Sequence, residues 1–351
     1  AMTKVGNRRC EALLREAELW WATAASVVPA EVTAELDELW KEVLLQQFHD
    51  IIPGSSITWV YEDSEAAHAL VAARAEVLIE RALANVAAAS NSVANAAGTA
   101  RAEVVACATS PLDGGDGPTQ TLHDGTVAAV VSTPAFGLAA HVAGPCDDHV
   151  SVTEHSFTNG HLSVSWNLDG TITSIIDVRA ARELLPPGRT VTTELAPDHP
   201  VEYDAWDVEQ WTRALGAPLA GVQSVEVVDA GPLVATVRVR REFGRSTMVT
   251  DMTLRAGSAR LDLTFDIDWQ EDEQLLSLML PLDVHAREAA CDIQFGHVMR
   301  PTHASNPWDA AKFEVCAHRY VDLSEPSFGV AVLNNGRYGH SVQEGGIRVS
   351  L

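Results

Sequence analysis

The sequence has 351 residues and 46% of them are hydrophobic, which is enough apolar material for two or three domains with cores of their own. Lysine and arginine number 24 against 48 aspartates and glutamates, so the formal net charge is −24. A strongly acidic protein is repelled by nucleic acid and by anionic membranes, so we expect neither as a partner.

Three helices are predicted near the start of the chain. Apolar residues recur at helical spacing over residues 5–28, 33–50 and 56–90, and Pro29 separates the first two segments. Long amphipathic helices with short joints favour antiparallel packing. We therefore predict a three-helix bundle over residues 1–95.

Hydroxyl side chains at the helix starts are candidate N-caps, because a serine or threonine oxygen can accept from the unpaired N–H groups of a first turn. Thr33 is the candidate for the second helix, and Ser55 or Ser56 for the third. The second helix is expected to reach His49 and Asp50 before Pro53 ends it.

The pattern changes period after the third predicted helix. Residues 87–100 are small and polar, which predicts a linker. Two strand-like runs on either side of an Asp- and Gly-rich turn follow, and they predict a small β-domain that we assign to residues 96–150.

Short alternating strands dominate from residue 151 onward. Residues 261–269 alternate over their whole length, and Asp169 with Gly170 forms a hairpin signal between two strand-like runs. This predicts a large antiparallel β-sandwich over residues 151–351, so the fold class is multidomain α+β.

The last residues, 346–351, end inside a strand-like pattern. A sandwich stopped there would lack strands and expose an edge or an apolar face. We therefore expect a truncated sandwich with self-association, that is, a homo-oligomer, or with a disordered tail.

The cysteines and the absence of targeting signals bear on the compartment. The five cysteines are scattered, without metal-type spacing, so a disulfide framework is not expected. No signal peptide and no long apolar run is present. The protein is expected to be cytoplasmic, unless a native N-terminus with a targeting signal has been removed.

Several strings resemble glycoside hydrolase family 38, the α-mannosidases, in the same order along the chain. The first contains Gln47-Phe48-His49-Asp50-Ile51 and Pro53-Gly54-Ser55-Ser56, the second is Tyr203-Asp204-Ala205-Trp206-Asp207, and the third ends in Arg300-Pro301-Thr302-His303. The resemblance covers residues 39–61, 203–207, 294–303, 313–319 and 329–334.

The resemblance implies a fold and a missing part. The family has a helical middle domain, a small β-domain and a large galactose-mutarotase-like sandwich, in agreement with the pattern above. It also has an α/β barrel ahead of these domains, which supplies the nucleophile and three of the four zinc ligands. No catalytic residue is therefore expected in this chain, and the barrel is its expected partner.

The resemblance also implies roles for two adjacent residues. His49 matches a ligand of the family's single active-site zinc ion, and Asp50 matches a residue that binds the sugar. From residue types alone, a surface His–Asp pair at a helix end is the favoured interpretation, because one histidine cannot define a zinc site. Zinc is expected to bind this chain weakly or not at all.

Four further residues are candidate substrate contacts. Asp204, Trp206 and Asp207 combine carboxylates with an aromatic face, which suits a sugar, although packing between domains would use the same residues. Arg300 matches a family motif, and a surface or interdomain ion pair is its alternative. His297, His303 and His318 do not form a metal site by any spacing that the sequence contains.

The function expected from the resemblance is that of a fragment of a zinc-dependent, retaining α-mannosidase. Its substrates would be terminal α-mannosides of glycans, and the fragment alone would be inactive. The alternative is a carbohydrate-binding or protein-interaction β-sandwich without catalysis, because sandwich folds host many functions.

Overall fold

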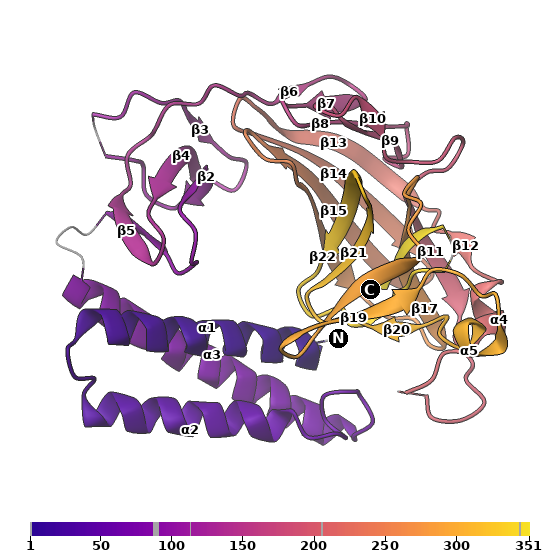
Figure 1. Ribbon diagram of the computed structural model, residues 1–351, viewed down its shortest axis with the longest axis horizontal. Helices are drawn as coiled ribbons and strands as arrows, with labels where there is room; N and C mark the ends of the chain where they lie inside the picture. Colours follow the sequence, from indigo (N-terminus) through magenta and orange to yellow (C-terminus); the bar gives the residue numbers. More distant parts are fainter. Residues whose placement is uncertain (1, 87–90, 113, 205, 344) are drawn as a thin grey trace.

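The computed structural model describes residues 2–86, 91–112, 114–204, 206–343 and 345–351 (Figure 1). Three long helices come first, and antiparallel sheets make up nearly all of the remainder. Figure 1 shows the helices side by side below the sheets, with the chain running from the bundle through a small β-unit into the sandwich. The predicted multidomain α+β fold is confirmed.

The bundle consists of α1 (Met2–Ala24), α2 (Ala30–Gln46) and α3 (Thr58–Val86). Consecutive helices run in opposite directions, as predicted (Figure 1). Each helix buries one stripe in a shared core, which includes Leu14, Trp20, Leu39, Val43 and Leu78. None of the helices within the described ranges is long and apolar enough to cross a membrane.

The predicted caps are wrong. Helix α2 begins at Ala30 with Pro29 as its N-cap residue, and Thr33 Oγ1 donates to the Pro29 carbonyl oxygen at 3.3 Å instead of accepting from the first turn. Pro29 has a φ of −56°, which suits a helix entry without a side-chain cap. The hydroxyls of Ser55 and Ser56 donate to Asp50 rather than capping α3.

Helix α2 also ends earlier than predicted. Its last residue is Gln46, and the next two amides close tighter turns, from Gln47 N to Leu44 O at 3.2 Å and from Phe48 N to Leu45 O at 3.1 Å. His49 and Asp50 therefore lie in the turn that follows the helix, not on the helix itself.

The predicted linker contains a strand. Residues 87–90 lie outside the described residues, but β1 (Ser92–Asn95) pairs antiparallel with β5 (Gly137–Ala140). Asn95 is buried, and its Nδ2 donates to the carbonyl oxygens of Thr99 and Pro134. These bonds satisfy a polar side chain that a linker would leave in water.

The small β-unit adds a three-stranded sheet of β2 (Arg101–Cys107), β4 (Val127–Thr133) and β3 (Thr119–Thr121). It packs on the sandwich, because Val104 and Ala128 belong to the sandwich's hydrophobic core cluster. Gln120 reinforces the contact: its Oε1 accepts from the amides of Leu233 and Val234 at 2.9 and 2.8 Å.

The sandwich contains four antiparallel sheets. The first is β10 (Arg182–Glu183), β9 (Ile172–Asp177), β8 (Leu162–Trp166), β7 (Ser156–Thr158) and β6 (Ser151–Val152). The second is β12 (Ala217–Pro218), β11 (Thr192–Pro197), β17 (Gln274–Pro281), β24 (Gly346–Ser350), β23 (Gly339–Ser341) and β20 (Val315–Cys316).

The third sheet is β13 (Val222–Ala230), β14 (Val234–Phe243), β15 (Ser246–Arg255) and β16 (Leu261–Asp268). The fourth is β19 (Gly296–Pro301), β18 (Glu288–Ile293), β21 (Tyr320–Glu325) and β22 (Phe328–Leu333). Two short helices, α4 (Gln210–Arg213) and α5 (Pro307–Ala310), lie in the connections.

Alternation along the strands builds the core, as predicted. In β8, Leu162, Val164 and Trp166 are buried while the serines between them are partly exposed. Asp169 and Gly170 form the expected turn between β8 and β9, and Gly170 has a φ of +75°, which favours glycine.

The expected disordered tail is wrong for residues 345–351. Strand β24 lies inside its sheet, between β17 and β23, so both of its edges are paired. Its residues Ile347 and Val349 are buried in the core.

His340 is a buried histidine in this sheet. It is fully buried on β23, its Nδ1 lies 3.1 Å from the Tyr338 carbonyl oxygen, and its Nε2 has no partner among the described residues. Burial lowers its pKa from 6.5 to about 4. The neutral imidazole is therefore favoured in the folded state.

We expect the free energy of unfolding to fall as the pH drops from about 6.5 to 4, because the unfolded chain binds a proton there that the folded chain does not. The loss is about 3 kcal/mol for a shift of this size. Urea unfolding at several pH values measures it. The substitution His340→Asn should reduce the change in unfolding free energy with pH. The control His285→Asn, at an exposed side chain, should leave that pH dependence unchanged. An unchanged pH dependence in His340→Asn would refute this assignment.

Candidate functional site

The turn between α2 and α3 presents His49 and Asp50 to solvent. Their side chains are 72% and 52% exposed, and Nε2 of His49 lies 3.6 Å from Oδ2 of Asp50. The ring of Phe48 lies 4.3 Å from the His49 ring, centroid to centroid. Imidazole and carboxylate are therefore adjacent and available to a ligand.

Hydrogen bonds within the turn fix its shape. Ser56 Oγ donates to the Asp50 carbonyl oxygen at 2.5 Å, and the Ser56 amide donates to the Tyr61 hydroxyl oxygen at 2.7 Å. The same Tyr61 hydroxyl lies 3.5 Å from the Asp50 carbonyl oxygen. The serines that the sequence predicted as caps thus position Asp50.

The turn is also attached to the first helix. Lys4 Nζ donates to the Pro53 carbonyl oxygen at 3.2 Å. Gln47 Nε2 donates to Asn7 Oδ1 at 3.0 Å and to Glu11 Oε1 at 2.9 Å. These three residues of α1 hold both ends of the turn that carries His49.

The same stretch of α1 packs on the sandwich. A Cβ atom at Gly336 would lie 2.9 Å from the Cα of Val5, so the two backbones are in close contact. Burial lowers the pKa of His318, on the sandwich side, and the positive charge of Arg8 lowers it further. The joint between bundle and sandwich therefore lies one residue along α1 from the contact with the His49 turn.

Arg300, on β19, lies near this joint. Cys316 is exposed on one side, yet partial desolvation by its neighbours raises the pKa of its thiol. The charges of Lys4 and Arg300 lower that pKa. Both cations are therefore close to Cys316. The Nε atom of Arg300 is buried, with no hydrogen-bond partner among the described residues.

The remaining candidates lie in the connection between β11 and α4. Tyr203 has a φ of +61°, and its carbonyl oxygen accepts from the amides of Trp206 at 2.7 Å and Asp207 at 3.0 Å. Trp206 is 58% exposed, and Asp204 and Asp207 are exposed too. Ala205 lies outside the described residues.

This loop is not joined to the His49 turn by any hydrogen bond or ion pair in the described ranges. In the view of Figure 1 both project at the lower right of the molecule. Asp204 lies near the carboxylate of Asp198, and the two negative charges repel. Burial raises the pKa of Asp198, and the Asp204 charge raises it further. The site candidates thus form two groups, one at the joint and one in this loop.

His297, His303 and His318 have different neighbours. His297 is opposite Asp292 in the β18–β19 pair, His303 Nδ1 lies 3.6 Å from Asp309 Oδ2, and His318 stacks on Tyr338. Within the part of the chain that the structure describes, no three His, Cys, Asp or Glu side chains are grouped so as to hold a metal ion. For zinc, these residues supply His49 but not a complete ligand set.

Sequence reasoning missed the residues that support the turn. Asn7 and Glu11 were covered only by the predicted helix 5–28, and Lys4 preceded it; no local pattern links the three to a turn some forty residues away. Asp198 was missed too, although it lies close before the Tyr203 string.

Family models match both parts of the chain. The model described as "Glycosyl hydrolases family 38 C-terminal domain" matches residues 157–351, more than half of the chain. The chain belongs to glycosyl hydrolase family 38. A second model, "Alpha mannosidase middle domain", matches residues 1–86.

Relatives with curated names agree with this membership. Human alpha-mannosidase 2C1 is 31% identical over 373 aligned residues, which cover 100% of this chain and 35% of the relative. Alpha-mannosidase G of Dictyostelium discoideum is 28% identical, and the alignment covers 100% of this chain and 37% of that relative. The family 38 chain thus spans about a third of the length of these relatives.

Solved structures share the fold. An alpha-mannosidase from Enterococcus faecalis V583 superposes with a TM-score of 0.79 at 15% identity, covering 100% of this chain and 51% of the other. A second family 38 protein from Enterococcus faecalis has a TM-score of 0.73 at 14% identity, and the superposition covers 99% of this chain and 52% of the other. At these identities the likeness supports the fold alone.

Tyr61→Phe tests the support of the turn. Without the phenolic oxygen the Ser56 amide loses its acceptor, so we expect its hydrogen exchange to become roughly 2- to 10-fold faster. Exchange measured by NMR or mass spectrometry follows this amide. Tyr203→Phe, on an exposed ring, is the control; equal exchange at Ser56 in all three proteins would contradict the role of Tyr61.

Proposed function

We propose that this chain is the middle and C-terminal part of a zinc-dependent, retaining α-mannosidase that hydrolyses terminal α-mannosides of glycans. Membership of family 38 and the names of its relatives support the substrate class. The observation that carries the proposal is the exposed His49–Asp50 pair, held in a turn that α1 fixes against the sandwich.

The residues of the turn suit a sugar site that is shared with another part of the enzyme. His49 would provide one imidazole ligand to zinc, and Asp50 would accept hydrogen bonds from sugar hydroxyls. When bound, zinc would hold vicinal hydroxyls as a Lewis acid. The remaining zinc ligands, the nucleophile and the acid/base would come from the barrel, so the chain alone would be inactive.

The other candidates would act around this centre. Arg300 would bring a positive charge and an available N–H donor to the joint, since its Nε has no partner among the described residues. The exposed Trp206 could stack on a pyranose ring, with Asp204 and Asp207 accepting from hydroxyl groups. These roles require the β11–α4 loop to face the same ligand as the His49 turn.

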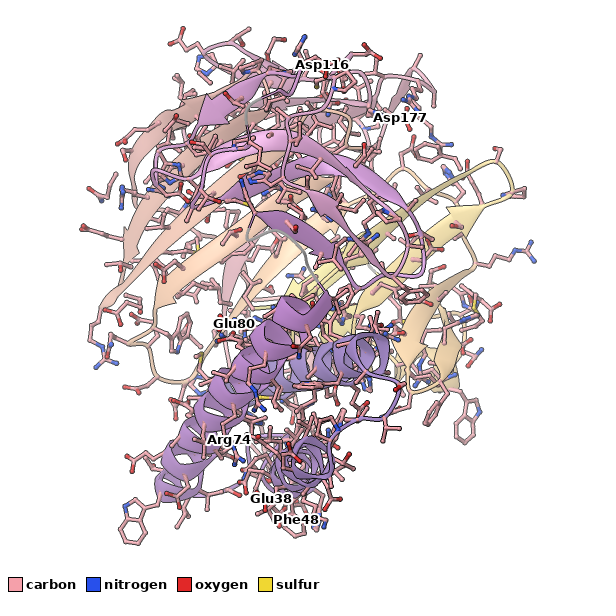
Figure 2. The ribbon with its side chains drawn as sticks, turned by 90° about the vertical axis from the view of Figure 1, so that its left-hand side faces the viewer. Glu38, Phe48, Arg74, Glu80, Asp116 and Asp177 are labelled. Carbon is pink, nitrogen blue, oxygen red and sulfur yellow. The ribbon has the colours of Figure 1, made fainter. Side chains whose placement is uncertain are left out.

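The surface around the His49 turn fits an additional domain. Exposed apolar side chains bracket the turn, and Trp59 is 74% exposed. Figure 2 shows Phe48 at the outer edge of the bundle, on the side away from the sheets. A concentration of exposed apolar residues marks an interaction site. We assign it to the barrel, because the relatives are about three times as long as this chain; the residues are Leu44, Leu45, Phe48, Ile57 and Trp59.

A second candidate function is glycan binding by the β-domains without catalysis. The exposed rings of Tyr203 and Trp206 favour it, because aromatic faces contact sugars in binding modules. The two candidates can be separated in a protein that includes the barrel. Glycan binding that persists in Trp206→Ala and is lost in His49→Ala would favour the mannosidase site over binding by the β-domains alone.

Zinc titration tests the leading proposal. We expect a protein that joins these residues to the barrel to bind about one zinc ion per chain, and His49→Ala to weaken that binding on the order of 100-fold or more and to abolish hydrolysis of a chromogenic α-mannoside. The 351-residue chain should bind zinc weakly, because it contributes one imidazole.

His285→Ala is the matched control, since that side chain is also exposed and lies on the sandwich. It should leave zinc affinity and hydrolysis unchanged. Tight, stoichiometric zinc binding by the 351-residue chain would mean that all ligands lie within it, and hydrolysis without the barrel would place the nucleophile there too. Either result would overturn the shared-site proposal.

A further inference from the structure

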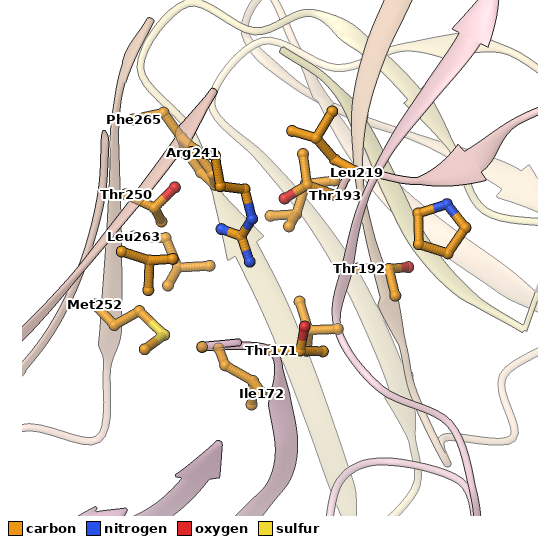
Figure 3. A pocket seen from close by; sticks show the side chains of 15 residues that line it. Thr171, Ile172, Thr192, Thr193, Leu219, Arg241, Thr250, Met252, Leu263 and Phe265 are labelled. Carbon is orange, nitrogen blue, oxygen red and sulfur yellow. The ribbon is translucent and has the colours of Figure 1, made fainter. Parts of the chain in front are cut away.

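A partly open cavity of about 50 Å³ lies between the β14–β16 strands of one sheet of the sandwich and β11 and β17 of another (Figure 3). The turn at Asp169 and Gly170 closes one side. A Cβ atom at Gly170 would lie 2.5 Å from the Val239 side chain, so the turn reaches between the sheets. The turn therefore forms one wall of the cavity, which is partly open to solvent elsewhere.

Arg241 projects into this cavity from β14 (Figure 3). Its side chain belongs to a residue that is only 8% exposed. One terminal nitrogen, Nη2, donates to the Asp169 carbonyl oxygen at 3.0 Å, while the buried Nε has no partner among the described residues. Burial lowers the pKa of Arg241, and the Asp169 charge only partly offsets this.

Other buried arginines of the sandwich differ from Arg241 in one respect. Arg213 pairs with the Glu314 carboxylate, and Arg348 pairs with Glu194 at 2.6 Å. Within the described residues Arg241 has no carboxylate at ion-pair distance. A buried guanidinium without a counter-charge is costly, so this position is suited to an anion from solution.

Hydroxyl groups share the cavity with the guanidinium. Thr250, on β15, is 7% exposed, and its buried Oγ1 has no hydrogen-bond partner within the described ranges. Figure 3 shows the Thr250 and Thr193 hydroxyls on opposite sides of Arg241. A charged donor, the Arg241 guanidinium, and a neutral donor, the Thr250 hydroxyl, thus line the same cavity.

The size and the walls of the cavity limit what can bind. Its volume corresponds to about three to five water molecules. The walls also include Met252, Leu263 and Phe265, which offer no hydrogen bonds. A single positive charge and this volume suit a small monovalent anion better than a sugar or a phosphate ester of metabolite size.

We propose that the sandwich binds a small monovalent anion in this cavity, held by the Arg241 guanidinium and the Thr250 hydroxyl. The anion would compensate the buried charge and join β14 and β15 to the Asp169 turn. It would therefore stabilise the sandwich. This site does not depend on the proposed mannosidase activity and is distinct from the His49 turn.

Thermal unfolding at constant ionic strength tests the site. Sodium gluconate, whose anion is too large for the cavity, is replaced stepwise by sodium chloride or sodium acetate, and Tm is followed for the full chain. We expect a saturable rise of about 2–4 °C with at least one of the two small anions. No rise with either would mean that water alone fills the cavity, and the proposal would be wrong.

Variants assign the effect to the cavity. Arg241→Met removes the charge at similar length and should abolish the rise, whereas Arg240→Met, on the exposed neighbour in the same strand, should retain it. An equal rise in Arg241→Met would identify a general salt effect and overturn the proposal.

Thr250→Val provides an independent readout if Arg241→Met does not fold. Valine keeps the shape of threonine without its hydroxyl, so the half-saturating anion concentration should increase by roughly 10-fold. An unchanged half-saturating concentration would exclude Thr250 as a ligand and refute the site as described.

Discussion

The attachment of the His49 turn to α1 is the contact on which the arrangement of the candidate site depends. Lys4 holds the turn through the Pro53 carbonyl, and Asn7 and Glu11 hold it through Gln47. The same helical stretch packs on the sandwich at Gly336. Because one rigid helix contacts both, the position of His49 is set relative to the β-domains rather than by the turn alone.

This arrangement explains how a short, exposed turn can hold a defined geometry. Loops are usually mobile because few of their backbone groups form hydrogen bonds within the protein. Here the Asp50 carbonyl, the Ser56 amide and the Pro53 carbonyl each have a partner, while the side chains of His49 and Asp50 remain exposed. The backbone is fixed and the functional groups are left available, which suits a site completed by another domain.

Buried polar groups of the sandwich are accommodated in three ways. Arg213 and Arg348 have carboxylate partners, whereas His340 is neutral and Arg241 faces a cavity. Each is a different solution to the cost of removing a polar group from water: pairing, loss of charge, or a ligand from solution. The bundle contains a further example of lost charge in His68, which is 4% exposed and whose pKa is lowered by burial.

The sequence by itself determined the helices, the strands from residue 151 onward and the turn at Asp169 and Gly170, because each follows from periodicity or from one residue's backbone preference. It placed His49 and Asp50 by their resemblance to a family. Tertiary structure decided the end of α2, the pairing of Ser92–Asn95, and the partners of Lys4 and Arg241. Those features depend on residues distant in the chain, and no local pattern encodes which groups packing brings together.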